Sequence, residues 1–175
     1  MAKIILLKAE KGSGKTTALI RLLEKLTTLS VCARGVVSPP VEEDGIKIAI
    51  NLMDVSSGEE KRLAVPKKDE NNEPPGLHWR FEPGTLAWGN RLLADAVPCD
   101  ILFVDEMGPL EFNQGEGLMK GFEAINSRRY LVALVTIRPS LLETAMSHWP
   151  DAEVYEVTRK NQSRLVSDLF RQITK

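Results

Sequence analysis

The sequence predicts a three-layer α/β fold, in which helices cover both faces of a mostly parallel central sheet. Short apolar runs typical of buried strands alternate with helix-like amphipathic stretches almost throughout the chain. Such alternation is typical of parallel sheets, whose strands are connected through helices. The 175 residues, 43% of them hydrophobic and 27% charged, suffice for one compact core. We therefore expect residues 1–175 to form a single domain.

The first third of the chain predicts a strand, a helix and a second strand. Residues 3–8 are a short apolar run that ends at a glycine-rich turn, which indicates a buried strand. Residues 15–29 carry leucines at helical spacing, namely Leu19, Leu22, Leu23 and Leu26. Because Lys and Arg lie on the opposite face, this stretch is predicted to be an amphipathic helix. Residues 31–37 predict the second strand, which the prolines at 39 and 40 end.

Residues 41–65 differ in character and predict a small antiparallel insert. The run IKIAINLM at 46–53 alternates in hydropathy, KRLAV follows at 61–65, and Gly45 and Gly58 mark turns. The polar, proline-rich residues 66–76 are interpreted as a surface loop or a mobile lid.

The remaining residues continue the alternation of helices and strands. Helices are predicted over 85–97, 115–128 and 140–148, and strands over 101–104, 130–136 and 152–158. Asn161 is expected to cap a last helix that buries Leu165, Leu169 and Ile173.

A phosphate-binding motif follows the first strand. Residues 9–16 (AEKGSGKT) match G-x-x-x-x-G-K-[ST], except that Ala9 replaces the first glycine. The backbone N–H groups of such a loop surround phosphates, and the following helix adds the positive end of its dipole. The motif makes the predicted fold that of a P-loop nucleoside triphosphatase. The residues predicted to bind nucleotide here are Ala9, Glu10, Lys11, Gly12, Ser13, Gly14, Lys15, Thr16 and Thr17.

Two acids after the strand at 101–104 complete the predicted site. Ligands in such folds bind at the carboxyl ends of the strands, so Asp105 and Glu106 are expected to face the phosphate loop and the nucleotide. Asp105 suits the outer shell of Mg²⁺, which the Thr16 hydroxyl is expected to bind. Glu106 suits a general base for water, and Lys15 is expected to assist catalysis by bridging the β- and γ-phosphates. A solvated acidic turn is the alternative, which the neighbouring phosphate motif disfavours.

Weaker candidates lie at other strand ends. Thr136 is suited to sensing the γ-phosphate or its water, and a threonine that merely ends a strand is an equally good interpretation. Arg138 and Arg159 are candidates for contacting transition-state charge, with ordinary surface arginines as the favoured interpretation. The three tryptophans, Trp79, Trp88 and Trp149, are interpreted as packing residues rather than as stacking partners of a base.

Charge and hydropathy narrow the expected partners and location. The formal net charge of −1 lacks the basic excess of a nucleic-acid-binding protein. No apolar stretch approaches the roughly 20 residues that span a bilayer, and the first residues lack the pattern of a signal peptide. The two cysteines have no ligand-like spacing, so reduced thiols are expected. We expect a cytoplasmic protein without membrane contact, and its oligomeric state stays open.

With these motifs in place, the chain resembles the nucleoside-triphosphatase family known from thermophiles and, in humans, as cancer-related NTPase. The resemblance covers nearly the full length. It rests on GSGKTT, on the insert at 35–53, on FE at 81–82, on VDEMGPLEF at 104–112 and on residues 154–170. The chain departs from the family pattern at Ala9, Pro109 and Gln162, where Gly, Lys and Arg are usual. The resemblance implies Mg²⁺-dependent hydrolysis of ATP, GTP, CTP and UTP, with little base preference and slow turnover.

Two other functions were weighed against hydrolysis. A P-loop kinase would need an acceptor pocket and usually an arginine-rich lid, whereas residues 66–76 hold two lysines and no arginine. A nucleotide-dependent binding or regulatory module would need a nucleotide-sensitive surface, which the sequence does not reveal. No Asn-Lys-x-Asp guanine motif is present, which argues against a dedicated GTPase.

Overall fold

A computed structural model describes residues 1–67 and 79–174, and within these residues nine strands form one sheet. Its main path runs β6-β5-β4-β2-β7-β8-β1-β9, and β3 pairs with β4. The strands are β1 (Lys3–Ala9), β2 (Ala33–Val37), β3 (Pro40–Glu43), β4 (Ile46–Asp54), β5 (Glu60–Pro66), β6 (Trp79–Phe81), β7 (Ile101–Val104), β8 (Val132–Ile137) and β9 (Glu153–Val157). Most of the loop predicted at 66–76 lies outside the described residues.

The sheet has a parallel half and an antiparallel half. Strands β2, β7, β8, β1 and β9 are neighbours in that order and are all parallel. Strand β4 joins β2 antiparallel, and β3, β5 and β6 continue the sheet in antiparallel pairs. The carboxyl ends of the parallel strands therefore share one edge, which is where ligands bind in sheets of this kind.

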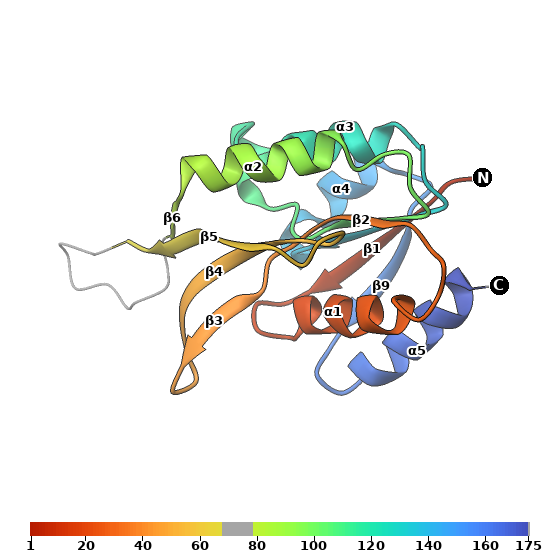
Figure 1. Cartoon of the computed structure of the whole chain (residues 1–175), viewed down its shortest axis with the longest axis horizontal. Helices are drawn as coiled ribbons and strands as arrows, with labels where there is room; N and C mark the ends of the chain where they lie inside the picture. The colour runs from red at the N-terminus through yellow and green to blue at the C-terminus, as the bar shows by residue number, and fades with distance from the viewer. Residues whose placement is uncertain (68–78, 175) are drawn as a thin grey trace.

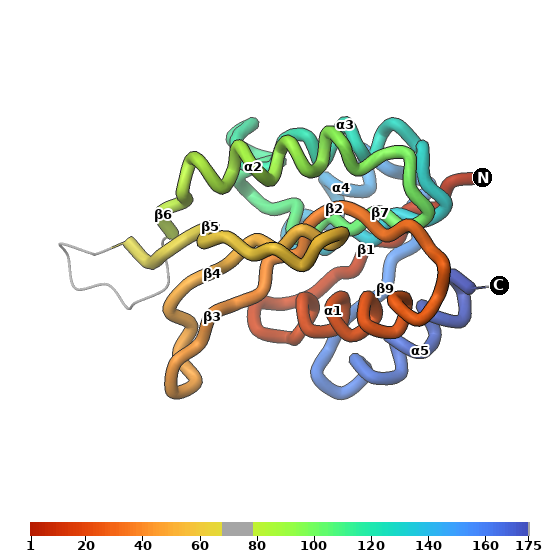
Figure 2. Tube along the Cα trace, viewed as in Figure 1, coloured from red at the N-terminus to blue at the C-terminus, as the bar shows by residue number. Residues whose placement is uncertain are grey.

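Helices cover both faces of the parallel half, as predicted (Figure 1). One face carries α1 (Lys15–Leu26) and α5 (Gln162–Ile173). The other carries α2 (Pro83–Ala94), α3 (Lys120–Asn126) and α4 (Leu142–His148), and the trace in Figure 2 shows the same three layers. A short π-helix (Leu110–Gln114) precedes α3, and a 3₁₀ turn (Pro139–Leu141) precedes α4.

Strand β1 shows why the sheet divides the core in two. Ile4 and Leu6 point to the face under α2, α3 and α4, whereas Ile5 and Leu7 point to the face under α1 and α5. All four side chains are buried. Because successive side chains alternate between the faces of a strand, a continuous apolar run is what a strand covered on both sides requires.

The structure corrects several predicted boundaries. The antiparallel insert is larger than 41–65, since β3 starts at Pro40 and β6 ends at Phe81. The helix predicted over 115–128 is confined to α3, because Gly115 and Gly117 adopt positive φ angles that interrupt it. The Asn161 side chain does not cap α5. Its amide instead accepts from the Thr158 N–H at 2.9 Å and donates to the Glu156 carbonyl at 2.8 Å.

No helix in the described part of the chain is long and apolar enough to cross a membrane.

Candidate active site

A cavity of about 570 Å³ opens at the shared edge of the parallel strands. Its walls come from segments that follow β1, β2, β7, β8 and β9, together with the insert and the start of α2. The predicted residues among its lining are Lys11, Gly12, Gly14, Lys15, Thr16, Thr17, Asp105 and Glu106. Ala9, Glu10 and Ser13, although predicted to bind nucleotide, are not part of that lining.

Ala9 closes β1 rather than opening the loop. It pairs with Val157 of β9 and is 1% exposed, so its methyl group belongs to the core. Glu10 and Ser13 instead shape the turn that follows, since the Ser13 hydroxyl donates to the Glu10 carbonyl at 2.7 Å. The substitution of alanine for the first motif glycine is thus accommodated by packing.

The phosphate loop passes into α1 at Gly14, whose φ of 84° is in the left-handed region. The Gly14 carbonyl accepts from the Ala18 N–H at 2.9 Å and from the Gln162 side-chain amide at 2.6 Å. The Gly12 carbonyl accepts from the Arg159 side chain at 3.1 Å. Two carbonyls of the loop are thus bound by side chains of the β9–α5 segment. The first N–H groups of α1 have no acceptor within the helix, so they are suited to binding an anion.

Asp105 lies at the centre of the site and is fully buried. One carboxylate oxygen accepts from the Thr16 hydroxyl at 2.7 Å and from the Ser38 N–H at 3.0 Å. The other accepts from the Thr136 hydroxyl at 2.5 Å. A further bond, from the Ser38 hydroxyl to the Asp105 carbonyl, fixes the backbone. The carboxylate is thereby held by groups from α1, from the segment after β2 and from β8.

Glu106 is held between two cations. One of its oxygens is paired with the Lys15 ammonium. The other accepts from the Arg138 Nε at 3.1 Å. The Glu106 side chain is 21% exposed and that of Arg138 47%, so this carboxylate faces the open cavity, unlike Asp105. Arg138 is exposed, as the surface interpretation expected, but β8 also brings its guanidinium into contact with Glu106 at the end of β7.

Two lysines in the cavity have lowered pKa values. Burial lowers the pKa of Lys15, and nearby Arg138 and Lys47 add to this effect while Asp105 opposes it. Burial also lowers the pKa of Lys47, and its largest charge contribution comes from Lys11. Desolvated cations close to one another favour a polyanion, which replaces lost water and offsets their mutual repulsion.

The segment after Glu106 is organised by Glu111, a buried acid. Its two oxygens accept from the N–H groups of Gly108 and Leu118, each at 2.9 Å. Burial raises the pKa of this carboxyl above its ordinary value. Both oxygens are turned to the backbone, so Glu111 holds the shape of one cavity wall.

Sequence reasoning missed several residues of the site. Ser38, Lys47 and Gln162 line the cavity without having been given a role. The ammonium of Lys47 also lies 5.1 Å above the ring of Trp79, which lines the same cavity, whereas Trp88 and Trp149 are buried in the core as predicted. Alternating residues 46–53 indicated the strand that carries Lys47, but only the pairing of β4 with β2 places it near the phosphate loop.

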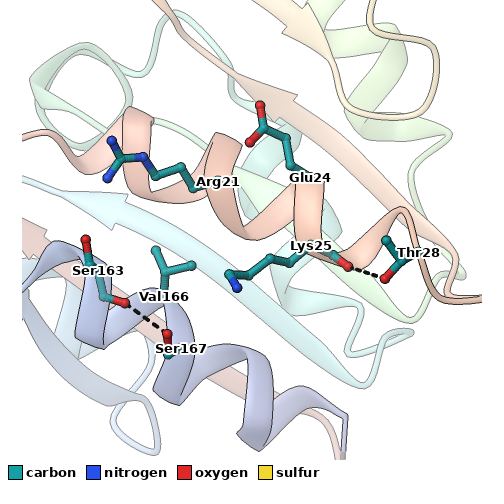
Figure 3. Close-up of a pocket in the computed structure, with 7 residues that line it drawn as sticks. All are labelled: Arg21, Glu24, Lys25, Thr28, Ser163, Val166 and Ser167. Atoms are coloured by element: carbon teal, nitrogen blue, oxygen red, sulfur yellow. Dashed lines mark hydrogen bonds between the residues drawn. The ribbon is translucent and has the colours of Figure 1, made fainter.

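A second hollow, of about 520 Å³, lies between α1 and α5 (Figure 3). It is lined by Arg21, Glu24, Lys25, Thr28, Ser163, Val166 and Ser167. Two of its hydroxyls bond to carbonyls of their own segments, Thr28 to Lys25 at 2.8 Å and Ser167 to Ser163 at 3.1 Å. Both hydroxyls are therefore already engaged within their own segments.

Comparisons with known proteins place this chain among nucleoside triphosphatases. A family model described as NTPase matches residues 4–170. Nucleoside-triphosphatase THEP1 of Caldivirga maquilingensis is 25% identical over 173 residues, which cover 99% of this chain and 96% of that protein. Nucleoside-triphosphatase THEP1 of Thermofilum pendens is 26% identical over 179 residues, covering 98% and 96% of the two chains.

Solved structures share the fold. The solution structure of a human cancer-related nucleoside triphosphatase superposes with a TM-score of 0.70 at 20% identity, and covers 99% of this chain and 97% of that one. The crystal structure of THEP1 from Aquifex aeolicus gives a TM-score of 0.64 at 17% identity, with both chains fully covered. At these identities the likeness supports the three-layer fold.

Proposed function

Since this chain belongs to the NTPase family, we propose that it hydrolyses the β–γ phosphoanhydride of nucleoside triphosphates with a water that Glu106 activates. The observation that carries the proposal is the position of the Glu106 carboxylate. It lies between the Lys15 ammonium and Arg138, directly beside the buried pair of Thr16 and Asp105. A candidate general base (Glu106), two cationic side chains and a candidate metal site therefore lie side by side in the cavity.

The residues present fit Mg²⁺. This ion takes few protein ligands and is otherwise bound by water and phosphate oxygens, and no cluster of three or more His, Cys, Asp or Glu exists among the described residues. Because the Thr16 hydroxyl donates its proton to Asp105, its oxygen lone pairs are left for a cation. Thr16 would hold the ion directly and Asp105 through its outer shell. Bound there, Mg²⁺ would neutralise charge on the β- and γ-phosphates.

In this proposal, nucleotide binding separates Glu106, the proposed general base, from Lys15. Without phosphate, the Lys15 ammonium is the partner of the Glu106 carboxylate. In the proposed complex Lys15 turns to the β- and γ-phosphate oxygens, which carry more charge than one carboxylate. Glu106 then loses this partner, and its carboxylate is free to accept a proton from water.

Arg138 and Thr136 support the reacting end of the nucleotide. Arg138 contacts Glu106 at 3.1 Å, so its guanidinium is within reach of a γ-phosphate beside that carboxylate. There it would stabilise charge that develops in the transition state. Thr136 acts more indirectly, because its hydroxyl is committed to Asp105. Arg159 instead donates to the Gly12 carbonyl within the loop, a contact that would stabilise the loop.

The substrate range follows from where the contacts lie. The convergent charged groups of the cavity surround the position of the triphosphate, and we find no guanine motif. Hydrolysis of ATP, GTP, CTP and UTP should therefore proceed with similar kcat/KM values. The expected spread is within about tenfold, which is roughly 1.4 kcal/mol of transition-state discrimination.

Phosphate release from the four nucleotides, with Mg²⁺ and with Mg²⁺ chelated, tests this proposal. Release from all four that depends on the metal is the expected result. A preference of several hundredfold for one nucleotide would show that the base is recognised, and release that persists without metal would remove the role given to Thr16 and Asp105.

A further inference from the structure

The cavity continues past Glu106 into an apolar compartment. We use this term for the part lined by Ile50, Leu63, Trp79, Phe81, Leu86 and Leu118. Five of these side chains belong to, or pack against, the core cluster on the face under α2, and Trp79 lies two residues before Phe81 on β6. Because residues two apart share a face of a strand, both rings of β6 point the same way. The compartment therefore combines aliphatic walls with two aromatic rings.

The compartment lies on the far side of Glu106 from the phosphate loop. In the sheet, β1 carries the loop, β8 and β7 follow, and β4, β5 and β6 lie beyond β2. In the order of the sheet, Glu106 at the end of β7 thus lies between the phosphate loop and the insert strands. Figure 1 shows β4, β5 and β6 on the side of the sheet away from β1 and β9.

In the binding mode of the proposed function, the nucleotide's own base lies away from this compartment. In the proposed function, on which this inference rests, the γ-phosphate lies next to Glu106 and Lys15 reaches both the β- and γ-phosphates. The triphosphate would therefore end at Glu106. Because the loop holds the α- and β-phosphates behind the γ-phosphate, the nucleoside would leave on the side of Gly12, Thr17 and Arg159, which also line the cavity. The apolar compartment begins where the nucleotide ends, so it faces the phosphorus atom that is attacked.

We propose that the apolar compartment binds a small aromatic alcohol, whose hydroxyl replaces water as the acceptor of the γ-phosphoryl group. Its ring packs against Trp79 and Phe81, and its hydroxyl reaches Glu106 at the mouth of the compartment. The hydroxyl oxygen forms a bond to Pγ while the bond from Pγ to the β–γ bridging oxygen breaks. That electron pair leaves on the β-phosphate of the nucleoside diphosphate, and the hydroxyl proton passes to Glu106. The products are a phosphate monoester and a nucleoside diphosphate.

Size and charge agree with this occupant. A cavity of about 570 Å³ that also holds a nucleotide leaves room for a small molecule only. Lys47 lies over the Trp79 ring at 5.1 Å and Arg138 contacts Glu106, so the boundary between apolar walls and phosphate site is cationic. This boundary suits an uncharged alcohol that becomes an anionic ester.

Phosphorus-31 NMR of the full chain with Mg²⁺ and ATP tests the proposal. The probes are benzyl alcohol, 2-phenylethanol and 4-pyridinemethanol, with ethanol at the same concentration as the control without a ring. We expect a new phosphomonoester signal with at least one ring alcohol, and more ADP than inorganic phosphate in that sample. Ethanol should give neither. Esters from ethanol as readily as from the ring alcohols, or equal ADP and phosphate with all three ring alcohols, would overturn the proposal.

Variants separate the compartment from the phosphate site. Trp79→Ala should lower the ratio of ester to inorganic phosphate by about tenfold or more, since a ring–ring contact is lost, and Trp79→Phe should restore most of it. Leu131→Ala, at a position 64% exposed, is the matched control. An unchanged ratio in Trp79→Ala would contradict the proposal. ADP formation without any alcohol measures the proposed hydrolysis alone. Failure of the hydrolysis proposal can therefore be distinguished from failure of the proposed transfer to an alcohol.

Discussion

Lys15 is the residue whose partner changes when a phosphate arrives, and its loss should act on binding first. Lys15→Ala removes a charged donor and leaves the Glu106 carboxylate to repel phosphate, so affinity for a non-hydrolysable ATP analogue should fall about tenfold to hundredfold. Titration calorimetry measures the affinity. Lys25→Ala, at the other end of α1, is the control and should bind as wild type does. Equal affinity in Lys15→Ala would refute the phosphate-loop assignment.

Substitution of Asp105 should change the Mg²⁺ requirement of hydrolysis, because this carboxylate is proposed to hold the metal. Asp105→Asn keeps an acceptor for the Thr16 hydroxyl but removes the negative charge beside the proposed Mg²⁺ position. The Mg²⁺ concentration for half-maximal hydrolysis should rise about tenfold or more, and the maximal rate should fall. Metal titrations of the rate measure this. Asp54→Asn changes a buried carboxylate bonded to Ser56 and Ser57, and should leave the requirement unaltered. The same Mg²⁺ requirement in both variants would contradict the assignment.

Among individual residues, the sequence predicted those site residues that belong to a local sequence motif. Lys15 and Thr16 sit in a glycine-rich loop, and the strand before Asp105 and Glu106 brings both acids to the cavity. For Arg138 the surface interpretation was favoured, and for Thr136 two interpretations were equally good, because a polar residue at a strand end has many ordinary explanations. Lys47 could not be predicted, since its position depends on which strand pairs with β2.

The segment between β7 and α3 is the element whose shape depends most on one side chain. Glu111→Ala would leave the buried N–H groups of Gly108 and Leu118 without their acceptor. Each unpaired group costs about 1–3 kcal/mol, so the free energy of unfolding should fall by roughly 2 kcal/mol or more. Chemical denaturation measures it. Glu116→Ala, exposed on the same segment, should cost little. Equal losses in the two variants would show that Glu111 does not hold this wall.

Elements were predicted best where the hydropathy pattern was long. The strands β1, β7 and β8 and the helices α1 and α5 were all expected from periodicity. The missed elements are short. β6 has three residues, β3 begins at a proline that was interpreted as the end of a strand, and the π-helix at Leu110–Gln114 has no simple periodicity. These elements depend on tertiary pairing, which no local pattern contains.

At the scale of the whole molecule, the order of the strands creates the site. β1 and β7 are separated by β8, so the loop and the acids face each other across one strand while Arg138 rises from between them. The parallel half supplies the phosphate chemistry, and the antiparallel half supplies Lys47 and the apolar compartment. The sequence predicted both halves but not that they share one cavity.

Hydrolysis of Mg-ATP in water enriched in ¹⁸O, by the wild-type chain and by Glu106→Gln, tests the central claim most directly. Attack of water on Pγ predicts the label in inorganic phosphate and none in ADP. Glu106→Gln should lower kcat by about 10²-fold or more while the ATP analogue binds no more weakly, since the amide cannot take the proton. Glu42→Gln, an exposed acid on the same cavity, should retain the wild-type rate. Label in ADP, or a wild-type rate for Glu106→Gln at saturating Mg²⁺, would contradict the account.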